Sequence, residues 1–65
     1  MTDSEFQGMI ENVLVRGGVQ PWELGDFLGV SARTITRWAA GYDLPHTSLR
    51  VPIQASIQIF SEGRQ

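Results

Sequence analysis

Apolar residues recur along the first part of the chain at the spacing of a helix. Phe6 is followed by apolar residues at i+3, i+4, i+7 and i+8, which share one helical face: Met9, Ile10, Val13 and Leu14. Asp3 or Ser4 is expected to cap the start of this helix. Gly17–Gly18 is expected to end it. The pattern therefore predicts an amphipathic helix between these boundaries.

Two shorter apolar patterns follow, with a glycine between them. Pro21 suits the first position of a helix, where its missing N–H removes no hydrogen bond. Gly29 suits the left-handed conformation that often ends a helix. The residues between them that are expected to face the core are Leu24, Phe27 and Leu28.

Ser31 opens the next pattern and is a good N-cap residue, because its side-chain oxygen can accept a hydrogen bond from a backbone N–H. The inward positions of this helix are Ile35 and Trp38, and Gly41 is expected to close it. The two helices and the turn between them, about 21–40, therefore have the sequence form of a helix-turn-helix.

In a helix-turn-helix, the small and polar residues of this stretch would have specific structural roles. A close crossing of the two helices needs a small residue on the first of them, and Gly25 provides it. The second helix must carry hydrogen-bond donors on its outer and N-terminal face, and four residues qualify: Ser31, Arg33, Thr36 and Arg37. The sequence thus predicts a supporting helix followed by a presented helix.

The last apolar stretch predicts a helix over about 50–61. Its main apolar residues are Leu49, Val51, Ile53, Ile57 and Phe60. Proline is tolerated only in the first turn, so Pro52 indicates that the regular helix begins between Ser48 and Val51. Together the patterns predict an all-α fold, in which residues 1–65 form a single compact bundle of four or five short helices.

The composition excludes several kinds of site. The chain has no cysteine, so disulfides, thiol catalysis and cysteine-ligated zinc are excluded. His46 is the only histidine and no carboxylate cluster accompanies it, so neither a metal nor another cofactor is expected. No nucleophile–base pair and no phosphate-binding glycine loop is apparent, which argues against an enzyme. The apolar runs are too short to span a bilayer and the acidic N-terminus is unlike a signal peptide, so a cytoplasmic protein is expected, in a bacterium or a phage-infected cell.

The charges are distributed unevenly along the chain. The formal net charge is −2, whereas DNA-binding proteins usually carry a basic surplus. Residues 1–30 hold five acidic residues and one arginine, while residues 31–50 hold three arginines and one aspartate. All five basic residues are arginines, whose guanidinium can bond bidentately to a guanine edge or a phosphate. Positive charge is therefore concentrated on and just after the presented helix.

Residues 20–45 also match a known pattern. The matching residues are Leu24, Gly25, Leu28, Gly29, Val30, Ser31, Ile35, Arg37, Trp38, Gly41 and Pro45. This set resembles the helix-turn-helix family of phage Cro and lambda-type repressors and their bacterial relatives. The resemblance implies a compact helical domain that binds operator DNA, usually as a homodimer, to regulate transcription. The chain departs from the family at Pro21, where a glutamine usually opens the supporting helix, and at Gly25, where alanine is usual.

The resemblance places the base-reading positions of that family on four residues of the presented helix: Ala32, Arg33, Thr36 and Arg37. Arg33 and Arg37 are one helical turn apart and share a face. Each can bond to O6 and N7 of a guanine, with about 1–3 kcal/mol of discrimination per good bidentate contact. Ala32 offers only a methyl contact, for example to thymine.

Seven further residues around the motif are candidates for phosphate contacts: Gln20, Trp22, Ser31, Thr34, Tyr42, His46 and Arg50. Four of them have an alternative role. Trp22 is expected to cover the edge of the core in preference to leaning on the DNA backbone. His46 is expected to be a loop or cap residue in preference to a phosphate ligand, and the Tyr42 hydroxyl can bond water instead. Arg50 can equally pair with an acid such as Asp43.

Some apolar residues of the last helix lie outside the stripe that is expected to face the core. Val51, Ala55 and Ile59 are candidates for a homodimer interface, unless the first helix covers them. The sequence thus predicts a repressor or autoregulator that binds an inverted-repeat operator in double-stranded DNA as a homodimer, with the helix about 32–40 in the major groove and no small-molecule ligand. The alternative is a protein-interaction module of the same fold, such as an antirepressor or antitoxin, whose partner is a regulatory protein.

Overall fold

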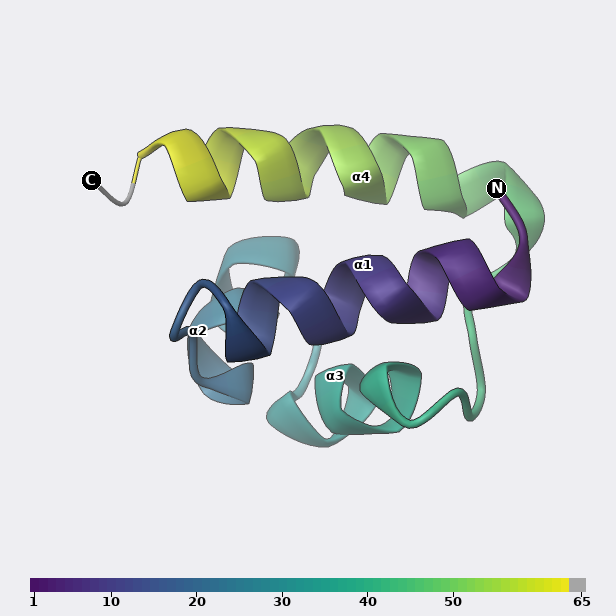
Figure 1. Cartoon of the computed structure of the whole chain (residues 1–65), viewed down its shortest axis with the longest axis horizontal. Helices are drawn as coiled ribbons and strands as arrows, with labels where there is room; N and C mark the ends of the chain where they lie inside the picture. The colour runs from purple at the N-terminus through teal and green to yellow at the C-terminus, as the bar shows by residue number, and fades with distance from the viewer. Residues whose placement is uncertain (64–65) are drawn as a thin grey trace.

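The computed structural model describes residues 1–63, which form four helices and no strand (Figure 1). The helices are α1 (Asp3–Val15), α2 (Pro21–Leu28), α3 (Ala32–Ala39) and α4 (Thr47–Glu62). The prediction of an all-α bundle is confirmed, with four helices in the described part of the chain. In this part no helix has the length and apolar character needed to cross a membrane.

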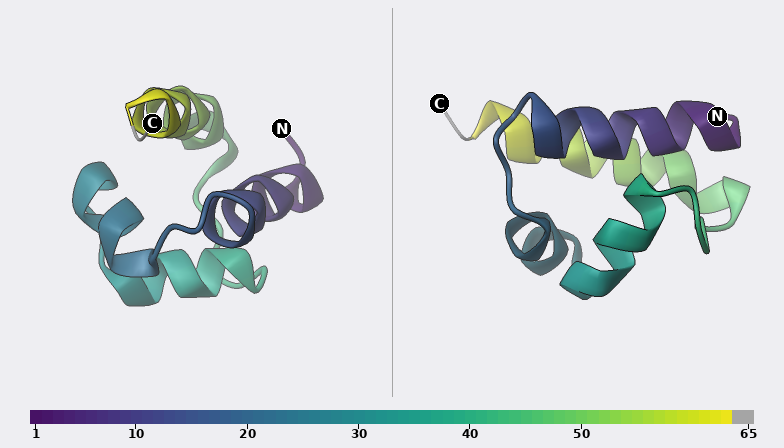
Figure 2. Two further views of the ribbon diagram at one scale, coloured as in Figure 1. Left: turned by 60° about the vertical axis from the view of Figure 1, so that its left-hand side comes forward. Right: turned by 60° about the horizontal axis from the view of Figure 1, so that its bottom comes forward.

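The four helices surround one core, and α1 and α2 lie between α3 and α4 (Figure 2). As a result α3 and α4 occupy opposite sides of the molecule. Each helix contributes to the buried core, which consists of Phe6, Ile10, Val19, Leu24, Ile35, Trp38 and Ile57. The rings of Phe6 and Trp38 meet edge to face, with their centroids 5.4 Å apart, a favoured aromatic arrangement. This contact fixes α3 against α1.

The N-terminus of α1 is capped one residue earlier than predicted. Thr2, and neither Asp3 nor Ser4, is the N-cap residue: its hydroxyl accepts from the Glu5 N–H at 3.2 Å. The Glu5 carboxylate in turn accepts from the Thr2 N–H at 2.8 Å, which completes a capping box. These bonds from Thr2 hold the pKa of Glu5 below its usual range. The stabilisation is therefore present at neutral pH and is lost as the pH falls through that lowered pKa.

The turn between α2 and α3 has the predicted glycine and cap. Gly29 adopts the left-handed conformation, with a φ of 79°, and the Val30 N–H closes α2 by donating to the Gly25 carbonyl oxygen at 2.9 Å. Ser31 then caps α3 by accepting from the Thr34 N–H at 3.1 Å. The turn backbone passes so close to α2 that a Cβ atom at Gly25 would lie 2.6 Å from the Val30 carbonyl oxygen. Gly25 is thus required by the turn.

Replacing Gly25 by alanine is expected to destabilise the protein by about 1–2 kcal/mol, because the strain of a clash with backbone exceeds the gain in helix propensity. Gly8 is the matched control, since it lies exposed within α1 and a Cβ atom there would have no neighbour within 4 Å. Gly8→Ala is expected to stabilise the protein by about 0.5–1 kcal/mol. Urea denaturation followed by circular dichroism measures both, and a stabilised Gly25→Ala variant would contradict the expectation.

The last helix begins at Thr47, just before the predicted window, and continues through Pro52. The early start is stabilised by His46, whose Nδ1 accepts from the Ser48 N–H at 3.1 Å. Pro52 has no N–H to donate to the Ser48 carbonyl oxygen, which is the cost of placing it beyond the first turn. The sequence predicts a slightly later start because proline is expected only in the first turn of a helix, whereas Pro52 lies beyond the first turn of α4.

Two aromatic residues of α2 were placed wrongly by the sequence reading. Trp22, expected to cover the core edge, is 59% exposed, and Phe27, expected to face the core, is 47% exposed. Phe27 contacts α4 instead, where its ring centroid lies 5.1 Å from that of Phe60. A helix as short as α2 can bury only a narrow stripe, and Leu24 and Gly25 occupy it.

Arg50, a candidate for a phosphate contact, belongs to the core instead. It is only 6% exposed. Its Nη1 donates to the Asp3 carboxylate at 2.7 Å and to the Met1 carbonyl oxygen at 3.3 Å, and its Nε donates to the Pro45 carbonyl oxygen at 3.0 Å. The acid that it pairs with is Asp3, whereas Asp43 had been named as an example. Arg50 therefore joins the start of α1 to the start of α4.

Candidate nucleic-acid interface

The outer face of α3 carries the four predicted base-reading residues. Ile35 and Trp38 point inward and are buried, which anchors the helix to the core. Ala32, Arg33 and Thr36 are exposed, and the Arg37 side chain is 41% exposed. The predicted inward and outward positions of this helix are confirmed, and the outward face carries Arg33, Thr36 and Arg37 together with the small side chain of Ala32.

The two arginines of this face differ in the contacts that their guanidinium groups make. Within residues 1–63 no hydrogen bond or ion pair is formed by the Arg33 guanidinium, so its five N–H donors face solvent. Arg37 pairs with Asp43: its Nε donates to Oδ2 at 2.6 Å, and its Nη2 contacts the same oxygen. The guanidinium also lies 5.9 Å from the centre of the Tyr42 ring, within range of a cation–π contact.

The Arg37–Asp43 pair was not anticipated from the sequence. The partners are six positions apart in sequence, and they meet only because the chain turns back after α3 at Gly41, which has a φ of 88°. Asp43 is itself left-handed, with a φ of 51°. Aspartate tolerates this conformation better than most residues, so Asp43 and the helix-ending Gly41 are the residues of the sequence that indicate this turn.

Hydroxyl groups at the start of α3 are engaged in capping. The Ser31 and Thr34 hydroxyls lie 2.9 Å apart, and Ser31 also accepts from the Thr34 backbone. The Thr36 hydroxyl donates to the Ala32 carbonyl oxygen at 3.0 Å. Its oxygen lone pairs remain available, so Thr36 faces a ligand as a hydrogen-bond acceptor. These bonds fix the side-chain orientations before any ligand arrives.

The N-terminus of α2 is open to solvent. Gln20 is its N-cap residue but makes no side-chain capping bond, and both Gln20 and Trp22 are exposed. Pro21 has no N–H, so the first backbone donor of the helix is that of Trp22. The positive end of the helix dipole attracts anions to such a position.

The remaining candidates lie beyond α3. Tyr42 is exposed beside the Arg37 guanidinium. His46 caps α4 through Nδ1, as the cap alternative predicted, and in its neutral form the N–H is then on Nε2. Arg50 is excluded from this surface because its guanidinium is buried and bonded on the side of α1.

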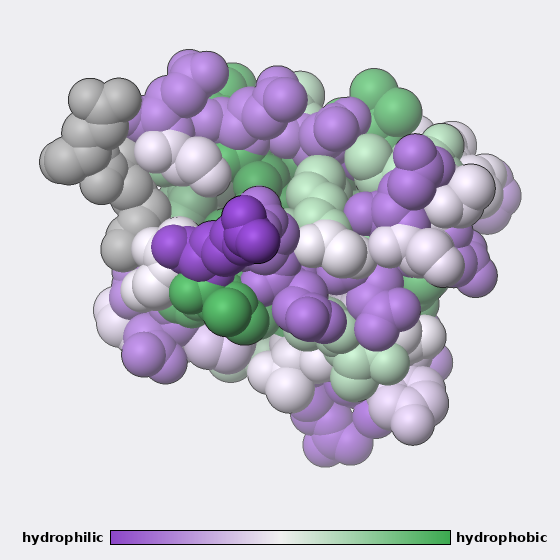
Figure 3. All heavy atoms as spheres, in the orientation of Figure 1, coloured by the Kyte–Doolittle hydropathy of each residue, from purple (hydrophilic) through white to green (hydrophobic). Residues whose placement is uncertain are grey.

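The outward face of α4 is apolar and uncharged. Val51, Ala55 and Ile59 are all exposed at successive turns, Ile59 by 64%, so α1 does not cover them. No charged residue occurs between Arg50 and Glu62. Apolar side chains reach the upper edge of the surface in Figure 3, where α4 runs. Since the inward side of α4 packs through Ile57, this face points away from α3 (Figure 2).

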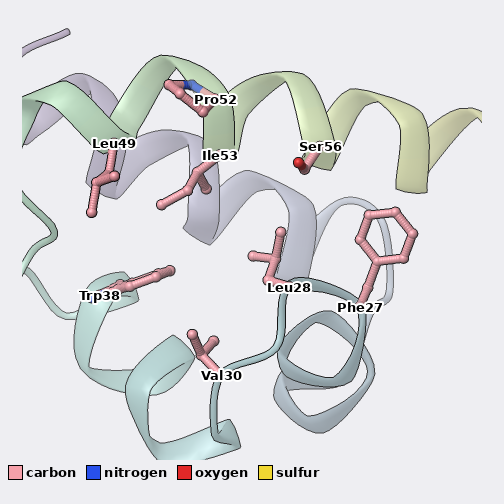
Figure 4. Close-up of a pocket in the computed structure, with 8 residues that line it drawn as sticks. All are labelled: Phe27, Leu28, Val30, Trp38, Leu49, Pro52, Ile53 and Ser56. Atoms are coloured by element: carbon pink, nitrogen blue, oxygen red, sulfur yellow. The ribbon is translucent and has the colours of Figure 1, made fainter.

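A second apolar feature is a groove between α2, α3 and α4, of about 290 Å³ (Figure 4). Its lining residues are Phe27, Leu28, Val30, Trp38, Leu49, Pro52, Ile53 and Ser56. Leu49 and Ile53 of α4 point toward Trp38 across the space. The sequence reading missed this groove, because it depends on the spacing between helices and not on any single pattern.

The described residues, 1–63, form no cluster of three or more side chains that could ligate a metal. Comparison with protein-family models, curated proteins and solved structures finds no match to this chain. Its function is therefore inferred from the geometry of α3 and its surroundings.

Proposed function

We propose that this protein is a sequence-specific DNA-binding regulator of the Cro and lambda-repressor type, acting as a repressor or autoregulator. The observation that carries the proposal is the outer face of α3, where Arg33 and Arg37 project one turn apart from a helix anchored by Ile35 and Trp38. A major groove admits one such helix. The protein acts by occupying DNA in the cytoplasm, and the proposal assigns it no cofactor and no catalytic step.

The base contacts follow from the side chains on this face. Arg33 has its whole guanidinium available and suits a guanine, to which it can donate at both O6 and N7. Arg37 can also donate to O6 and N7 of a guanine, through the N–H groups that are not bonded to Asp43. Thr36, as an acceptor, suits an amino group of adenine or cytosine, and the Ala32 methyl suits a thymine methyl.

Phosphate contacts would surround these base contacts. The Ser31 and Thr34 hydroxyls and the Trp22 backbone N–H lie at the N-terminal ends of α3 and α2, where helix dipoles favour an anion. Gln20 and Tyr42 are exposed nearby in sequence, and His46 would donate through Nε2. With a net charge of −2, the protein relies on these few contacts and not on a broad basic surface.

An inverted repeat would be bound by two copies whose α3 helices enter major grooves about 34–36 Å apart. The α4 face of Val51, Ala55 and Ile59 does not favour this dimer. It points away from α3, so two copies joined there would turn their α3 helices in opposite directions. We therefore propose that a dimer on an inverted repeat forms beside α3, and that the α4 face serves a different contact.

The proposal is tested by titrating the protein against duplex DNA from upstream of its own reading frame and against a scrambled duplex, at several salt concentrations. A regulator binds both more weakly as salt rises, and binds its own upstream DNA more tightly than the scrambled duplex. Sedimentation of the complex reports how many copies bind. Absence of binding to either duplex at low salt would refute the proposal.

The exposed apolar groove and the α4 face favour a second candidate, a protein-interaction module such as an antirepressor or antitoxin. The α4 face offers uncharged surface on the side of the molecule away from α3, and the groove offers uncharged surface between α2, α3 and α4. A module of this kind would bind a regulatory protein and show little affinity for DNA. The salt titration separates the two functions.

A further inference from the structure

Asp43 is held against α3 at both its backbone and its side chain. Its carbonyl oxygen accepts from the indole Nε1 of Trp38 at 3.0 Å, and its carboxylate accepts from Arg37 at 2.6 Å. The Tyr42 N–H donates to the Arg37 carbonyl oxygen at 2.8 Å, which draws the loop onto the end of the helix. Since Trp38 is buried, the Asp43 backbone is fixed relative to the core, and the carboxylate projects toward Arg37 from this fixed position.

We infer that Asp43 is a specificity-determining residue, which positions the Arg37 guanidinium for a base edge and weakens its attraction to phosphate. The inference rests on the proposed DNA-binding function. It assigns a role to an acidic residue that lies at the candidate interface, where negative charge opposes DNA binding in general.

The positioning follows from the donors that Asp43 occupies. Nε and Nη2 of Arg37 both face Oδ2 of Asp43. A guanidinium has five N–H donors in a fixed fork, so the bonds to Asp43 leave the end of the fork, formed by Nη1 and the second N–H of Nη2, free to bond to O6 and N7 of guanine. An arginine held in one orientation loses less side-chain entropy on binding than one that is free.

The selection against phosphate follows from charge. A phosphate oxygen placed near Arg37 would also be near the Asp43 carboxylate, which is 68% exposed and therefore accessible to a ligand. A guanine edge carries no net charge and meets no such repulsion. Asp43 therefore reduces binding to DNA of any sequence more than it reduces binding to a site with guanine at this position.

The experiment is a binding selection from a pool of duplexes with a randomised central segment, followed by sequencing. The wild-type protein is compared with Asp43→Asn, Asp43→Gly, Arg37→Ala and the charge-matched control Glu11→Gln. Asparagine and glycine both tolerate the left-handed backbone at this position. Glu11 is exposed on α1, and its side chain makes no hydrogen bond or ion pair with any of residues 1–63. Circular dichroism establishes that each variant is folded.

The wild-type protein and Glu11→Gln are expected to enrich the same motif. Asp43→Asn and Asp43→Gly are expected to lose preference at the one base position that Arg37→Ala also loses, and to bind a scrambled duplex about two- to fivefold more tightly. Unchanged preference in a folded Asp43 variant would overturn the inference and leave the proposed function intact. If the wild-type protein enriches no motif, both fail.

Discussion

Replacing Arg50 by methionine is expected to lower the free energy of unfolding by about 2–4 kcal/mol, because three hydrogen bonds from a buried cation are lost together. The bonds reach Asp3, Met1 and Pro45, so the variant also leaves carbonyl groups without a partner at the junction of α1 and α4. Methionine keeps much of the side-chain volume, and the loss therefore reports on the polar contacts. In a domain of this size each kcal/mol corresponds to about 4–8 °C in Tm.

Two variants control for this result. Arg16→Met removes an exposed arginine at the end of α1 and is expected to change stability by at most about 0.5 kcal/mol. Asp3→Asn removes only the exposed partner of the pair and is expected to cost about 1 kcal/mol or less. Thermal and urea unfolding measure the stability of the three variants. Equal stability of Arg50→Met and Arg16→Met would show that the buried guanidinium contributes nothing.

Replacing Arg33 by alanine is expected to weaken binding to the selected DNA site by about 10- to 100-fold, which is the loss of one bidentate base contact. The effect on a scrambled duplex is expected to be much smaller, because only one cationic contact is removed. Stability is expected to change little, since the Arg33 side chain is exposed and makes no hydrogen bond or ion pair to any of residues 1–63. Fluorescence anisotropy with a labelled duplex gives both affinities.

The control is Arg16→Ala, which removes one positive charge from the C-terminal end of α1, outside the candidate interface. It is expected to weaken binding to both duplexes slightly and equally. An Arg33→Ala variant that behaves in the same way would mean that Arg33 contributes only general charge. The base contact assigned to α3 would then be wrong, even if the protein binds DNA.

Local chemistry made much of the fold predictable. Pro21, Gly29 and Ser31 each impose a conformation or a bond on their immediate neighbours, so the bounds of α2 and α3 could be placed from the sequence. The spacing of Ile35 and Trp38 likewise fixed which side of α3 is buried. The capping box formed by Thr2 and Glu5 is also local, because it joins two residues three positions apart.

The features that were not predicted depend on contacts between distant elements. Arg50 and Asp3 are 47 residues apart in sequence, and no local pattern relates them. The exposure of Trp22 depends on how far α2 projects from the core. At the candidate interface, periodicity gave the exposed positions correctly, but it treated Arg33 and Arg37 as equivalent. The structure distinguishes them through Asp43.

The contacts of Arg50 also constrain the order in which the protein folds. The first helix and its capping box are complete within the first 15 residues, but the carboxylate of Asp3 meets its cation only when residue 50 is present. During synthesis, α1, α2 and α3 emerge before that cation does, and Ile57 joins the core later still. The α2–turn–α3 unit therefore acquires its contacts with α4 only after Thr47–Glu62 has been made, so the complete core depends on contacts between residues far apart in sequence.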